Sequence, residues 1–291
     1  MKPLVSIVTI NYKQKAVTAA LLDSIAKLSY PNLETIVVDN AQEGDDSGFY
    51  ASHLREVKVI NSVANLGFAG GNNLGMKAAN GEYIFLVNND TELSDGTIEA
   101  LLEGLESGPY GAISPVLRYY DAPEHIQFAG FTPINTLTGR NSMIRELEGM
   151  ALKSTPYFHG AAVMIPRAVI EDCGLMPDEY FLYYEELDWS RKIREKGYEL
   201  GVCESVYVLH KESMTTGKNS PLKTYYQTRN RLFFMNSEKG LLQKLAFRLF
   251  FNGVSMPVRL LRHALQGEFK HIEAMVRAVR HYRLGKMGMA F

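Results

Sequence analysis

The chain has few of the features that mark secreted, membrane-spanning or nucleic-acid-binding proteins. Its 291 residues include only two cysteines, Cys173 and Cys203, which lie far apart without the spacing of metal ligands. We therefore expect reduced, buried thiols. No run of eighteen apolar residues occurs, so the sequence predicts no transmembrane helix. A formal net charge of −1 argues against nucleic acid as a partner.

A targeting signal is also missing from the amino terminus. The first twelve residues, MKPLVSIVTINY, lead straight into a strand and lack the longer apolar segment and small-residue cleavage site of a signal peptide. We therefore expect a cytoplasmic protein. The length suits one large α/β domain with an appendage, or two modest domains.

Charge is unevenly distributed along the chain. From Lys239 onward there are ten basic and two acidic residues, which gives this tail a net charge of about +8. Helical patterns over residues 241–284, interrupted by Pro257 and Gly267, place apolar side chains opposite basic ones. Such helices could lie on anionic lipid at the inner face of the cytoplasmic membrane. Packing on the rest of the chain, or a homodimer, would use the same apolar faces, and the sequence leaves these alternatives open.

Strands and helices alternate over the first sixty residues. Apolar strands are predicted at Leu4–Asn11, Leu33–Val38 and Val57–Asn61, with helices at Lys15–Leu28 and in a short segment that ends at Arg55. This β-α-β-α-β order predicts a right-handed, parallel, nucleotide-binding half-domain.

The stretch EYIFLVNNDTEL, residues 82–93, combines a buried strand with polar residues at its end. Tyr83–Asn88 is continuously apolar or β-favouring, as in a strand covered on both faces. Asn88, Asn89 and Asp90 then fall at the carboxyl end, where open α/β sheets bind ligands. Asp90 could hold Mg²⁺ or Mn²⁺, with a substrate diphosphate and water as further ligands. A simple turn is the alternative, because all three residues favour turns.

A glycine-rich stretch, Asn65–Asn73, runs into a predicted helix through Met76 to Ala79. Glycines allow the backbone to approach a ligand, and a helix amino terminus favours anionic groups. The pattern is neither a Rossmann fingerprint nor a P-loop. Asp39 and Asp90, at the ends of the flanking strands, strengthen the prediction of a nucleotide site.

Three carboxylates, Glu185, Glu186 and Asp188, lie between an aromatic run and a basic helix predicted at Ser190–Lys196. Like charges this close should perturb each other's protonation, which suits a general base. The alternative is acidic decoration of a helix amino terminus, which the residues alone favour somewhat. A lone histidine such as His210, at the end of a predicted strand, is more often structural than a ligand.

The remaining elements follow from periodicity and turn residues. They are a helix capped by Ser94 or Asp95 and ending near Glu106, a strand at Ala112–Val116, a hairpin-rich insertion at Phe128–Arg140, a strand at Val163–Ile165, a helix at Arg167–Cys173, strands at Tyr198–Val202 and Val206–Leu209, and a polar loop at Lys211–Pro221 long enough to be a lid.

Taken in order, these stretches resemble family 2 glycosyltransferases of the GT-A (nucleotide-diphospho-sugar transferase) fold, and within them the rhamnosyltransferase-like branch that builds bacterial surface polysaccharides. The matching motifs run from residue 4 to about 231 and are VSIVTINYK, VVDNA, NLGFAGGNN, FLVNNDTEL, HGAAVMIPR, YYEELDW and YYQTRNR. The resemblance implies an α/β fold whose mostly parallel central sheet is flanked by helices. It also implies a catalytic domain over residues 1–221, with a nucleotide-binding half at 1–116 and an acceptor-side half at 117–221, and a helical carboxyl-terminal region at 222–291.

The resemblance also implies roles for single residues. Asp39 resembles the carboxylate that hydrogen-bonds a pyrimidine base, and Asn88 and Asp90 occupy the two ends of the family's Asp-x-Asp motif. Asp90 and His210 would bind the divalent ion, Mg²⁺ or Mn²⁺, while Asn88 lacks one charge of the motif and would contact ribose. The nucleotide-binding residues implied in this way are Thr9, Asn11, Tyr12, Asp39, Asn65, Gly70, Gly71, Asn72, Asn73, Asn88 and Asn89.

The implied activity is inverting, metal-dependent sugar transfer from a dTDP- or UDP-linked donor, with dTDP-rhamnose as one candidate. The acceptor would be a saccharide or a lipid-linked glycan. The acidic motif supplies the base, for which Glu186 is the first choice and Asp188 the second, with Glu185 beside them. Two alternatives remain open: a catalytically silent nucleotide- or glycan-binding component of an assembly system, and a nucleotidyltransferase.

Overall fold

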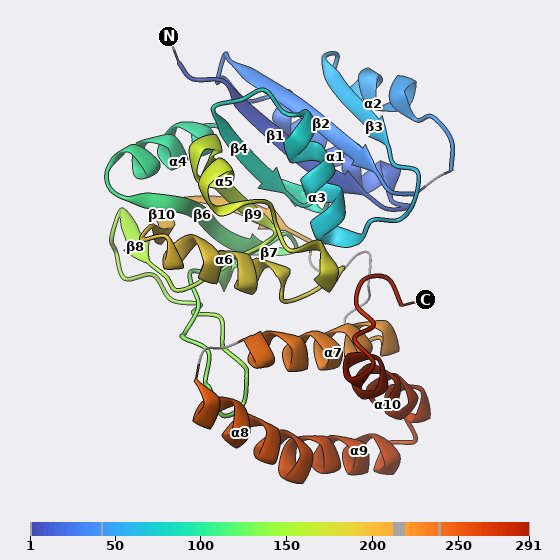
Figure 1. Cartoon of the computed structure of the whole chain (residues 1–291). Coiled ribbons are helices and arrows are strands. Elements are labelled where there is room, and N and C mark those ends of the chain that lie inside the picture. The colour runs from blue at the N-terminus through green and yellow to red at the C-terminus, as the bar shows by residue number, and fades with distance from the viewer. Residues whose placement is uncertain (1, 42, 212–218, 238–239, 291) are drawn as a thin grey trace. The chain divides into compact units, whose positions relative to one another are not determined.

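The computed structural model describes residues 2–41, 43–211, 219–237 and 240–290, and its contacts divide the chain into two compact units (Figure 1). The first, which we call the sheet unit, comprises Met1–Thr132, Met143–Asp178 and Glu185–Thr215. The second, the helical unit, comprises Pro133–Ser142, Glu179–Tyr184 and Thr216–Phe291. Two short segments from earlier in the chain therefore join the carboxyl-terminal helices in one unit.

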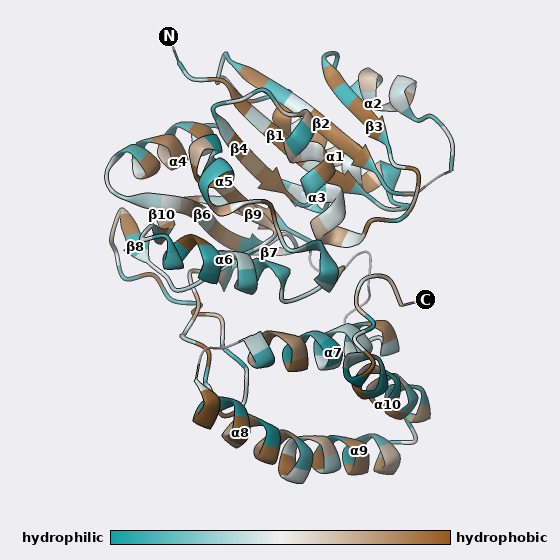
Figure 2. Ribbon diagram, viewed as in Figure 1, coloured by the Kyte–Doolittle hydropathy of each residue, from teal (hydrophilic) through white to brown (hydrophobic). Residues whose placement is uncertain are grey.

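The sheet unit is built on a ten-stranded sheet with the order β3-β2-β1-β4-β9-β6-β10-β5, to which β7 and β8 add at the side. Its first four strands are all parallel, as predicted, and are hydrophobic along most of their length (Figure 2). These strands are β1 (Val5–Asn11), β2 (Leu33–Asp39), β3 (Val57–Asn61) and β4 (Tyr83–Val87), and they alternate with α1 (Lys15–Ile25), α2 (Ser47–His53) and α3 (Gly67–Ala78).

The other half of the sheet is mixed. β9 (Ala162–Pro166) runs antiparallel between β4 and β6 (Tyr110–Tyr119), and β10 (Glu199–His210) is parallel to β6. The sequence predicts two strands here, Tyr198–Val202 and Val206–Leu209. The structure has the single strand β10 instead, and its register against β6 is irregular between Cys203 and Tyr207. The remaining elements of this unit are β5 (Thr91–Glu92), α4 (Thr97–Glu106), β7 (Ala122–Phe128), β8 (Leu152–Ser154), α5 (Arg167–Cys173), the 3₁₀ turn η1 (Asp178–Tyr180), which extends into the helical unit, and α6 (Glu185–Glu195).

Two predicted helix starts are wrong. The amino-terminal cap of α4 is Gly96, with φ at +80°, whereas Asp95 accepts hydrogen bonds from the backbone N and the Oγ of Ser29, both at 2.8 Å. Helix α6 begins at Glu185 and not at Ser190, so the acidic motif forms its first turn. Carboxylates in a first turn are favoured by the helix dipole, which explains the early start.

The structure describes both cysteines and the two ends of the predicted lid. Both thiols are free, and Cys203 is buried as expected, whereas Cys173 is partly exposed. Of the loop Lys211–Pro221, residues 212–218 lie outside the part of the chain that the structure describes.

Glycines in and just after the Asn65–Asn73 stretch lie in helix α3. Because α3 starts at Gly67, Gly70 and Gly71 are helical. A Cβ placed on Gly71 would lie 2.9 Å from Ile10 Cδ1, and one on Gly75 would lie 2.3 Å from Val8 Cγ1. The absent side chains of Gly71 and Gly75 therefore let α3 approach β1 closely, and the role of Gly70 and Gly71 in nucleotide binding stays a prediction.

The helical unit consists of α7 (Pro221–Ser237), α8 (Leu241–Phe250), the π-helical turn η2 (Phe251–Ser255), α9 (Met256–Leu265) and α10 (Phe269–Arg283). Helix α10 packs along α7 (Figure 1), and their shared core includes Tyr225, Tyr226, Ala274 and Ala278. Because α8, η2 and α9 are continuous, the chain forms one long helix with a single wider turn.

An unusual backbone segment is anchored inside the helical unit. Phe181, Tyr183 and Tyr184 have φ values of +68°, +68° and +79°, which side chains of this size rarely adopt. Asn230 Nδ2 donates to the carbonyl oxygens of Leu182 and Tyr183, both at 2.8 Å. One buried amide thus stabilises a strained backbone that would otherwise relax.

Replacing Gly75 by alanine should destabilise the protein, because the new methyl group would overlap Val8. We expect the free energy of unfolding to fall by about 1–3 kcal/mol, the usual cost of overpacking. Gly48→Ala is the matched control, since that helical glycine has open space around it and should gain up to about 1 kcal/mol. Urea denaturation measures both, and an unchanged midpoint for Gly75→Ala would contradict the packing described here.

Candidate active site

A chain of side-chain hydrogen bonds joins the carboxyl ends of three parallel strands. Asn11 Nδ2, at the end of β1, donates to Asp39 Oδ2 at the end of β2, at 2.9 Å. Thr18 Oγ1 of α1 donates to Asn11 Oδ1 at 3.1 Å, and Asn89 Nδ2, just after β4, donates to Thr18 Oγ1 at 3.0 Å. All four side chains are buried, so Asp39 is rigidly connected to the residue that precedes Asp90.

Asp39 is surrounded by hydrogen-bond donors. Its Oδ1 accepts from the backbone N of Ala41 at 2.7 Å, and the hydroxyl of buried Tyr50 donates to Oδ2 at 3.3 Å. Burial, with the nearby Asp39 charge as a further cause, raises the pKa of Tyr50, so this hydroxyl keeps its proton and remains a donor. The Asp39 carboxylate is therefore held in one orientation at the sheet edge.

Asp90 and His210 meet because a short strand pairs with the end of a long one. His210 lies opposite Thr91 in the antiparallel β5–β10 pair, and the backbone N of Lys211 donates to the carbonyl of Asp90 at 2.9 Å. His210 Nε2 consequently lies 3.2 Å from Asp90 Oδ1, and both residues are buried. The structure thus brings together the two residues for which a metal-binding role is implied.

The tautomer of His210 makes this contact informative. Its Nδ1 lies 2.8 Å from Gln127 Oε1, an acceptor as the amide is placed, so Nδ1 carries the proton. In the neutral form of the ring the Nε2 lone pair faces Asp90 Oδ1, which is buried without a hydrogen-bond partner. Two lone pairs repel unless a proton or a metal ion lies between them. In metal sites the ligating histidine is typically oriented by a hydrogen bond from its other ring nitrogen, as His210 is by Gln127.

The protein supplies only part of a coordination shell. Within residues 2–41, 43–211, 219–237 and 240–290, no group of three or more histidine, cysteine, aspartate or glutamate side chains converges on one point. Asp90 and His210 therefore fit a divalent ion as two ligands, with oxygens from a bound diphosphate and water left to complete the shell.

His159, which sequence reasoning did not single out, lies beside this pair. Its ring centroid is 6.2 Å from that of His210, and it stacks on Phe131 and contacts Phe128. Burial, and secondarily the His210 charge, lowers the pKa of His159 to about 3. The backbone N of Ala161 donates to His159 Nδ1 at 3.0 Å, so the neutral ring presents its proton on Nε2. The HGAAVMIPR motif was the available signal for this residue.

Glu186 lies next to the His159 segment. A Cβ built on Gly160 would lie 3.8 Å from Glu186 Cβ and 3.3 Å from the Phe68 ring, so the first turn of α6 abuts the residue that follows His159. Asp90, His210, His159 and Glu186 are therefore linked by successive close neighbours within the sheet unit.

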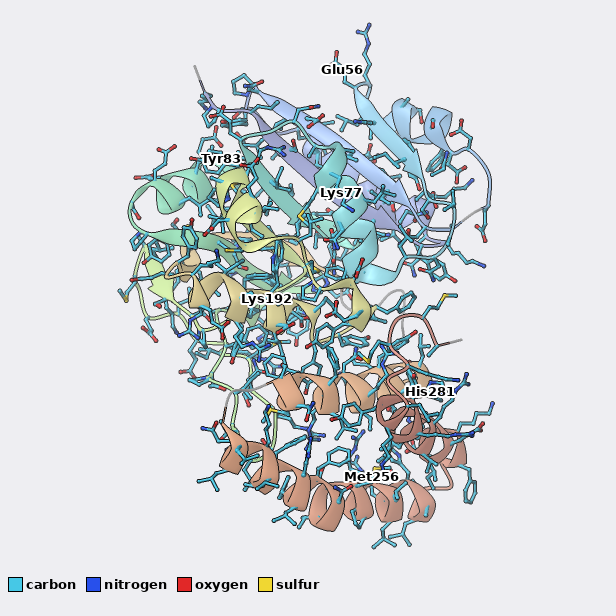
Figure 3. All side chains as sticks on the ribbon, viewed as in Figure 1. Glu56, Lys77, Tyr83, Lys192, Met256 and His281 are labelled. Carbon is cyan, nitrogen blue, oxygen red and sulfur yellow. The ribbon has the colours of Figure 1, made fainter. Side chains whose placement is uncertain are left out.

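The other two carboxylates of the acidic motif are less available. Asp188 is buried and pairs with Arg191 one turn later in α6, and its Oδ2 lies 3.6 Å from Nζ of Lys192, which is labelled in Figure 3. Glu185 is buried as well, whereas Glu186 is only half-buried. Glu186 is thus the most exposed residue of the three, although its Oε2 atom is buried.

Several residues predicted to line the nucleotide are engaged in shaping α3. Asn73 binds the backbone of Met176 through both ends of its amide, at 2.8 and 3.1 Å. Asn72 Nδ2 donates to the carbonyl of Phe68 at 3.1 Å, and Asn65 Oδ1 accepts from the backbone N of Gly67 at 3.0 Å. These amides hold the helix and its first turn in place.

The remaining predicted positions keep polar groups at the sheet edge. Thr9 Oγ1 is buried without a hydrogen-bond partner, and Tyr12 is half-buried with Lys13 Nζ 5.7 Å from its ring centroid. Asn88 is half-buried, and its backbone carbonyl accepts from Thr91. Gly70 has only Leu66 within 4 Å of its missing Cβ.

Comparison with known proteins identifies the family of the chain. The sequence model described as "Glycosyl transferase family 2" matches residues 6–174, more than half of the chain. The chain belongs to this family. Family membership makes it a glycosyltransferase and confirms the resemblance seen in the motifs.

Two relatives of this family 2 member carry functional names. The "Low-salt glycan biosynthesis hexosyltransferase Agl10" of Haloferax volcanii is 29% identical over 240 residues, which cover 80% of this chain and 75% of that protein. The "N-acetylglucosaminyl-diphospho-decaprenol L-rhamnosyltransferase" of Mycobacterium tuberculosis is 21% identical over 248 residues, which cover 75% of this chain and 80% of that one.

Solved structures confirm the GT-A fold of this glycosyltransferase. GalNAc-T7, solved with UDP, GalNAc and Mn²⁺, matches 88% of this chain with a TM-score of 0.65 and 13% identity; the chain spans 57% of its length. The mannosyltransferase PcManGT of Pyrobaculum calidifontis, solved with GDP-Man and Mn²⁺, matches 98% of this chain and 84% of its own, with a TM-score of 0.59 and 15% identity. At these identities the likeness establishes the fold alone.

Removing Asp90 should weaken binding of Mn²⁺ in the presence of a nucleoside diphosphate. We expect Asp90→Asn to lower the affinity at least tenfold, because the ion loses its charged protein ligand. Asp95→Asn is the matched control, since this carboxylate five residues later binds Ser29 instead. Electron paramagnetic resonance of free Mn²⁺ measures both variants, and equal affinities would rule out Asp90 as a ligand.

Proposed function

We propose that this chain is an inverting, metal-dependent glycosyltransferase that moves a sugar from a nucleoside diphosphate to an acceptor hydroxyl. The observation that carries the proposal is the 3.2 Å approach of His210 Nε2 to the buried, unpartnered Oδ1 of Asp90. This pair offers two ligands at the sheet edge where α/β folds bind nucleotides. The sheet unit would carry the transfer reaction.

In this proposal the donor lies along the carboxyl ends of the parallel strands. Asp39, fixed by Asn11 and Tyr50, would accept a hydrogen bond from a pyrimidine base, in keeping with a dTDP- or UDP-linked donor. Asp90 and His210 would hold the divalent ion, which when bound neutralises charge on the departing diphosphate. Mn²⁺ in two proteins of the same fold supports this assignment.

Glu186 is the proposed general base. An acceptor hydroxyl is a poor nucleophile until a carboxylate takes its proton, and attack from the face opposite the diphosphate would invert the anomeric carbon. Glu186 adjoins Gly160, next to His159, whereas Asp188 is committed to Arg191 and Lys192. Access to the hydroxyl therefore favours Glu186 over Asp188 as the base.

The names of the two relatives suggest the acceptor class. One is a glycan hexosyltransferase, and the other adds L-rhamnose to an N-acetylglucosaminyl-diphospho-decaprenol. We infer a saccharide or lipid-linked glycan as the acceptor, within bacterial surface polysaccharide synthesis, and rhamnose as a candidate sugar.

The helical unit supports a location at the membrane surface. Apolar side chains at least 46% exposed follow one another along α8, η2 and α9: Leu245, Leu249, Val254, Val258, Leu261 and Leu265. Steps of three or four residues keep them on one face, and the single step of five falls where the π-helical turn adds a residue. We call this set the apolar stripe; it is visible in Figure 2 as brown segments on α8 and α9.

Basic side chains accompany the apolar stripe. Arg248 and Arg262 are exposed and Lys244 is half-buried on the same helices, as expected for a helix that lies in the plane of an anionic bilayer. No helix within the described ranges is both long and apolar enough to cross a membrane. We therefore propose peripheral contact at the inner face of the cytoplasmic membrane, with a homodimer through the stripe as the alternative.

Neutralising the proposed base should remove most of the activity. We expect Glu186→Gln to lower kcat about 10²- to 10⁴-fold, the usual contribution of a general base, while donor affinity stays within twofold. Asp188→Asn is the matched control and should retain more activity than Glu186→Gln. Nucleotide release measured with a panel of donors and acceptors provides the rates. Full activity in Glu186→Gln would eliminate it as the base, and donor binding without turnover on any acceptor would favour a silent component.

Charging the apolar stripe should weaken attachment to vesicles. We expect the double variant Leu261→Glu and Leu265→Glu to lose at least tenfold in affinity for vesicles that contain phosphatidylglycerol, because carboxylates would enter the apolar layer. Val63→Glu is the matched control, an equally apolar and 93% exposed site in the sheet unit. Co-sedimentation measures binding. If the double variant instead converts a dimer to a monomer without changing sedimentation, the stripe is a dimer interface.

A further inference from the structure

Arg231 of α7 is an unusual buried cation in the helical unit. Only 2% of its surface is exposed, and its Nη2 donates to Ser255 Oγ at 3.3 Å. Its Nε and Nη1 are buried without a hydrogen-bond partner. An arginine presents five donors in a fixed plane, so two unused buried N–H groups leave part of this fork open to another acceptor.

A second arginine enters the same seam from the opposite helix. Arg259 Nη1, on α9, donates to Thr228 Oγ1 on α7 at 3.3 Å. Thr228 and Arg231 are three residues apart on α7, and Ser255 and Arg259 are four residues apart across η2 and α9. Each helix thus contributes one arginine and one hydroxyl, and each guanidinium group binds the hydroxyl of the opposite helix.

A third arginine, Arg140, comes from the Pro133–Ser142 segment of the helical unit. The preceding Gly139 is packed so closely that a Cβ on it would lie 2.7 Å from Met235 Cγ and 3.1 Å from Phe247 Cε2. Arg231 lies over the ring of the same Phe247, 5.5 Å from its centroid. Burial first, and then the charges of Arg140 and Arg259, lowers the pKa of Arg231 to about 10; burial and Arg140 also lower the pKa of Arg259.

The three charges have no acidic partner in the described part of the helical unit. None of the ion pairs among the described residues joins a carboxylate to Arg140, Arg231 or Arg259. Stacking over Phe247 and Phe251 offsets part of the desolvation of buried Arg231. The half-buried Arg259 and the exposed Arg140 add further positive charge near it. A buried charge without compensation is costly, so the arrangement calls for an anion from outside the chain.

We propose that Arg140, Arg231 and Arg259 form a binding site for a phosphoryl group, of phosphate or diphosphate size, with the hydroxyls of Thr228 and Ser255 beside it. Guanidinium groups pair with phosphate oxygens through parallel hydrogen bonds, and three positive charges match the charge of a diphosphate. This site lies wholly in the helical unit and is additional to the proposed donor site at Asp90.

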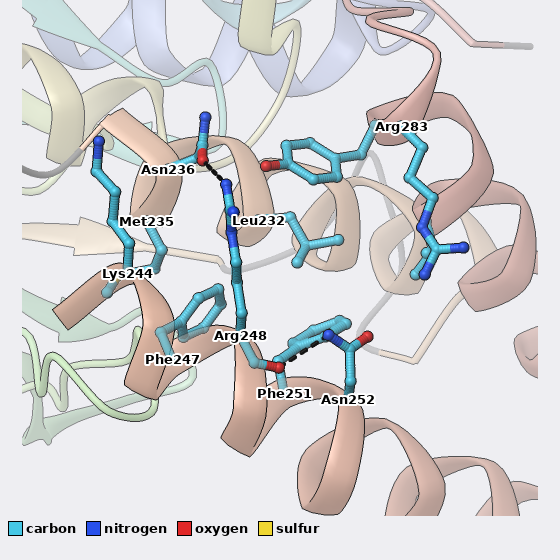
Figure 4. Close-up of a pocket in the computed structure, with 11 residues that line it drawn as sticks. Leu232, Met235, Asn236, Lys244, Phe247, Arg248, Phe251, Asn252 and Arg283 are labelled. Carbon is cyan, nitrogen blue, oxygen red and sulfur yellow. Dashed lines mark hydrogen bonds between the residues drawn. The ribbon is translucent and has the colours of Figure 1, made fainter. Parts of the chain in front are cut away.

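The surroundings of the site are also basic. Phe247 and Phe251 line a neighbouring pocket that carries Lys244, Arg248 and Arg283 (Figure 4). The phosphoryl group could be a free anion or could belong to a lipid, and both sources present the same chemistry to the arginines. The apolar stripe on α9 makes lipid-borne phosphate a source that can be tested directly.

Calorimetric titration with inorganic pyrophosphate in EDTA tests the site without involving the proposed metal. We expect the unmodified chain to bind pyrophosphate, and Arg231→Met and Arg140→Met each to weaken binding roughly 10- to 100-fold, because each variant removes a guanidinium group that would pair with the anion. Lys270→Met, an exposed cation on α10, is the matched control and should bind normally. Arg140 is exposed, so its variant should fold even if the Arg231 variant does not.

Two further readouts separate this site from its alternatives. Without pyrophosphate, Arg231→Met should melt at the same or a higher temperature, because a buried unpaired charge is removed. Asp90→Ala should abolish sugar transfer yet bind pyrophosphate normally, so failure of the proposed function would not imply failure of this site.

Vesicles identify the source of the phosphoryl group. Vesicles are prepared with phosphatidate or phosphatidylglycerol at equal mole fraction. Phosphatidate presents a phosphomonoester, whereas phosphatidylglycerol presents a phosphodiester. If lipid supplies the group, phosphatidate will be preferred by the unmodified chain, and Arg140→Met will lose that preference. If the group is a free anion, Arg140→Met will lose pyrophosphate binding but will bind both kinds of vesicle as the unmodified chain does. The proposal is overturned if the unmodified chain binds no pyrophosphate at millimolar concentration, or if both arginine variants bind it unchanged.

Discussion

The site depends on buried polar side chains that hydrogen-bond one another at the end of a parallel sheet. Asp39, Asn11, Thr18 and Asn89 come from β2, β1, α1 and the end of β4, and each is hydrogen-bonded to the next. A buried polar group that loses its partner carries the full cost of desolvation, so the chain of bonds holds these strand ends in one arrangement. The positions of Asp39 and Asp90 follow from this constraint, because one begins the chain and the other follows its last member.

Strand pairing makes the second contribution. Asp90 and His210 lie 120 positions apart in the sequence, and the two-residue strand β5 fixes them by pairing with the final residues of β10. Because side chains alternate between the faces of a sheet, a one-residue slip would turn His210 away from Asp90. The irregularity between Cys203 and Tyr207 sets the register of this end of β10 against β6. The pairing of β5 with β10 therefore brings the two proposed ligands together.

Sequence reasoning could find what each strand end carries, but not what tertiary pairing adds. Asp39 and Asp90 were predictable because a polar residue after an apolar run marks a carboxyl end. The roles of Gln127 and Thr18 could not be predicted. The sequence gives no sign that the amide of Gln127 will orient a histidine or that the hydroxyl of Thr18 will bind two asparagines. The packing role of Gly71 and Gly75 was hidden for a related reason. A glycine permits close approach, and the sequence does not say whether a ligand or a neighbouring strand approaches.

The two proposed sites follow the same physical logic with opposite charge. At Asp90 and His210 a carboxylate oxygen and a ring lone pair face each other, and a cation would relieve the repulsion. At Arg140, Arg231 and Arg259 the fold gathers positive charge beside unused donors, and an anion would relieve it. A fold that leaves such groups uncompensated is best understood as half of a complex, and the sign of the missing charge indicates what completes it: a divalent cation in the sheet unit and a phosphoryl group in the helical unit.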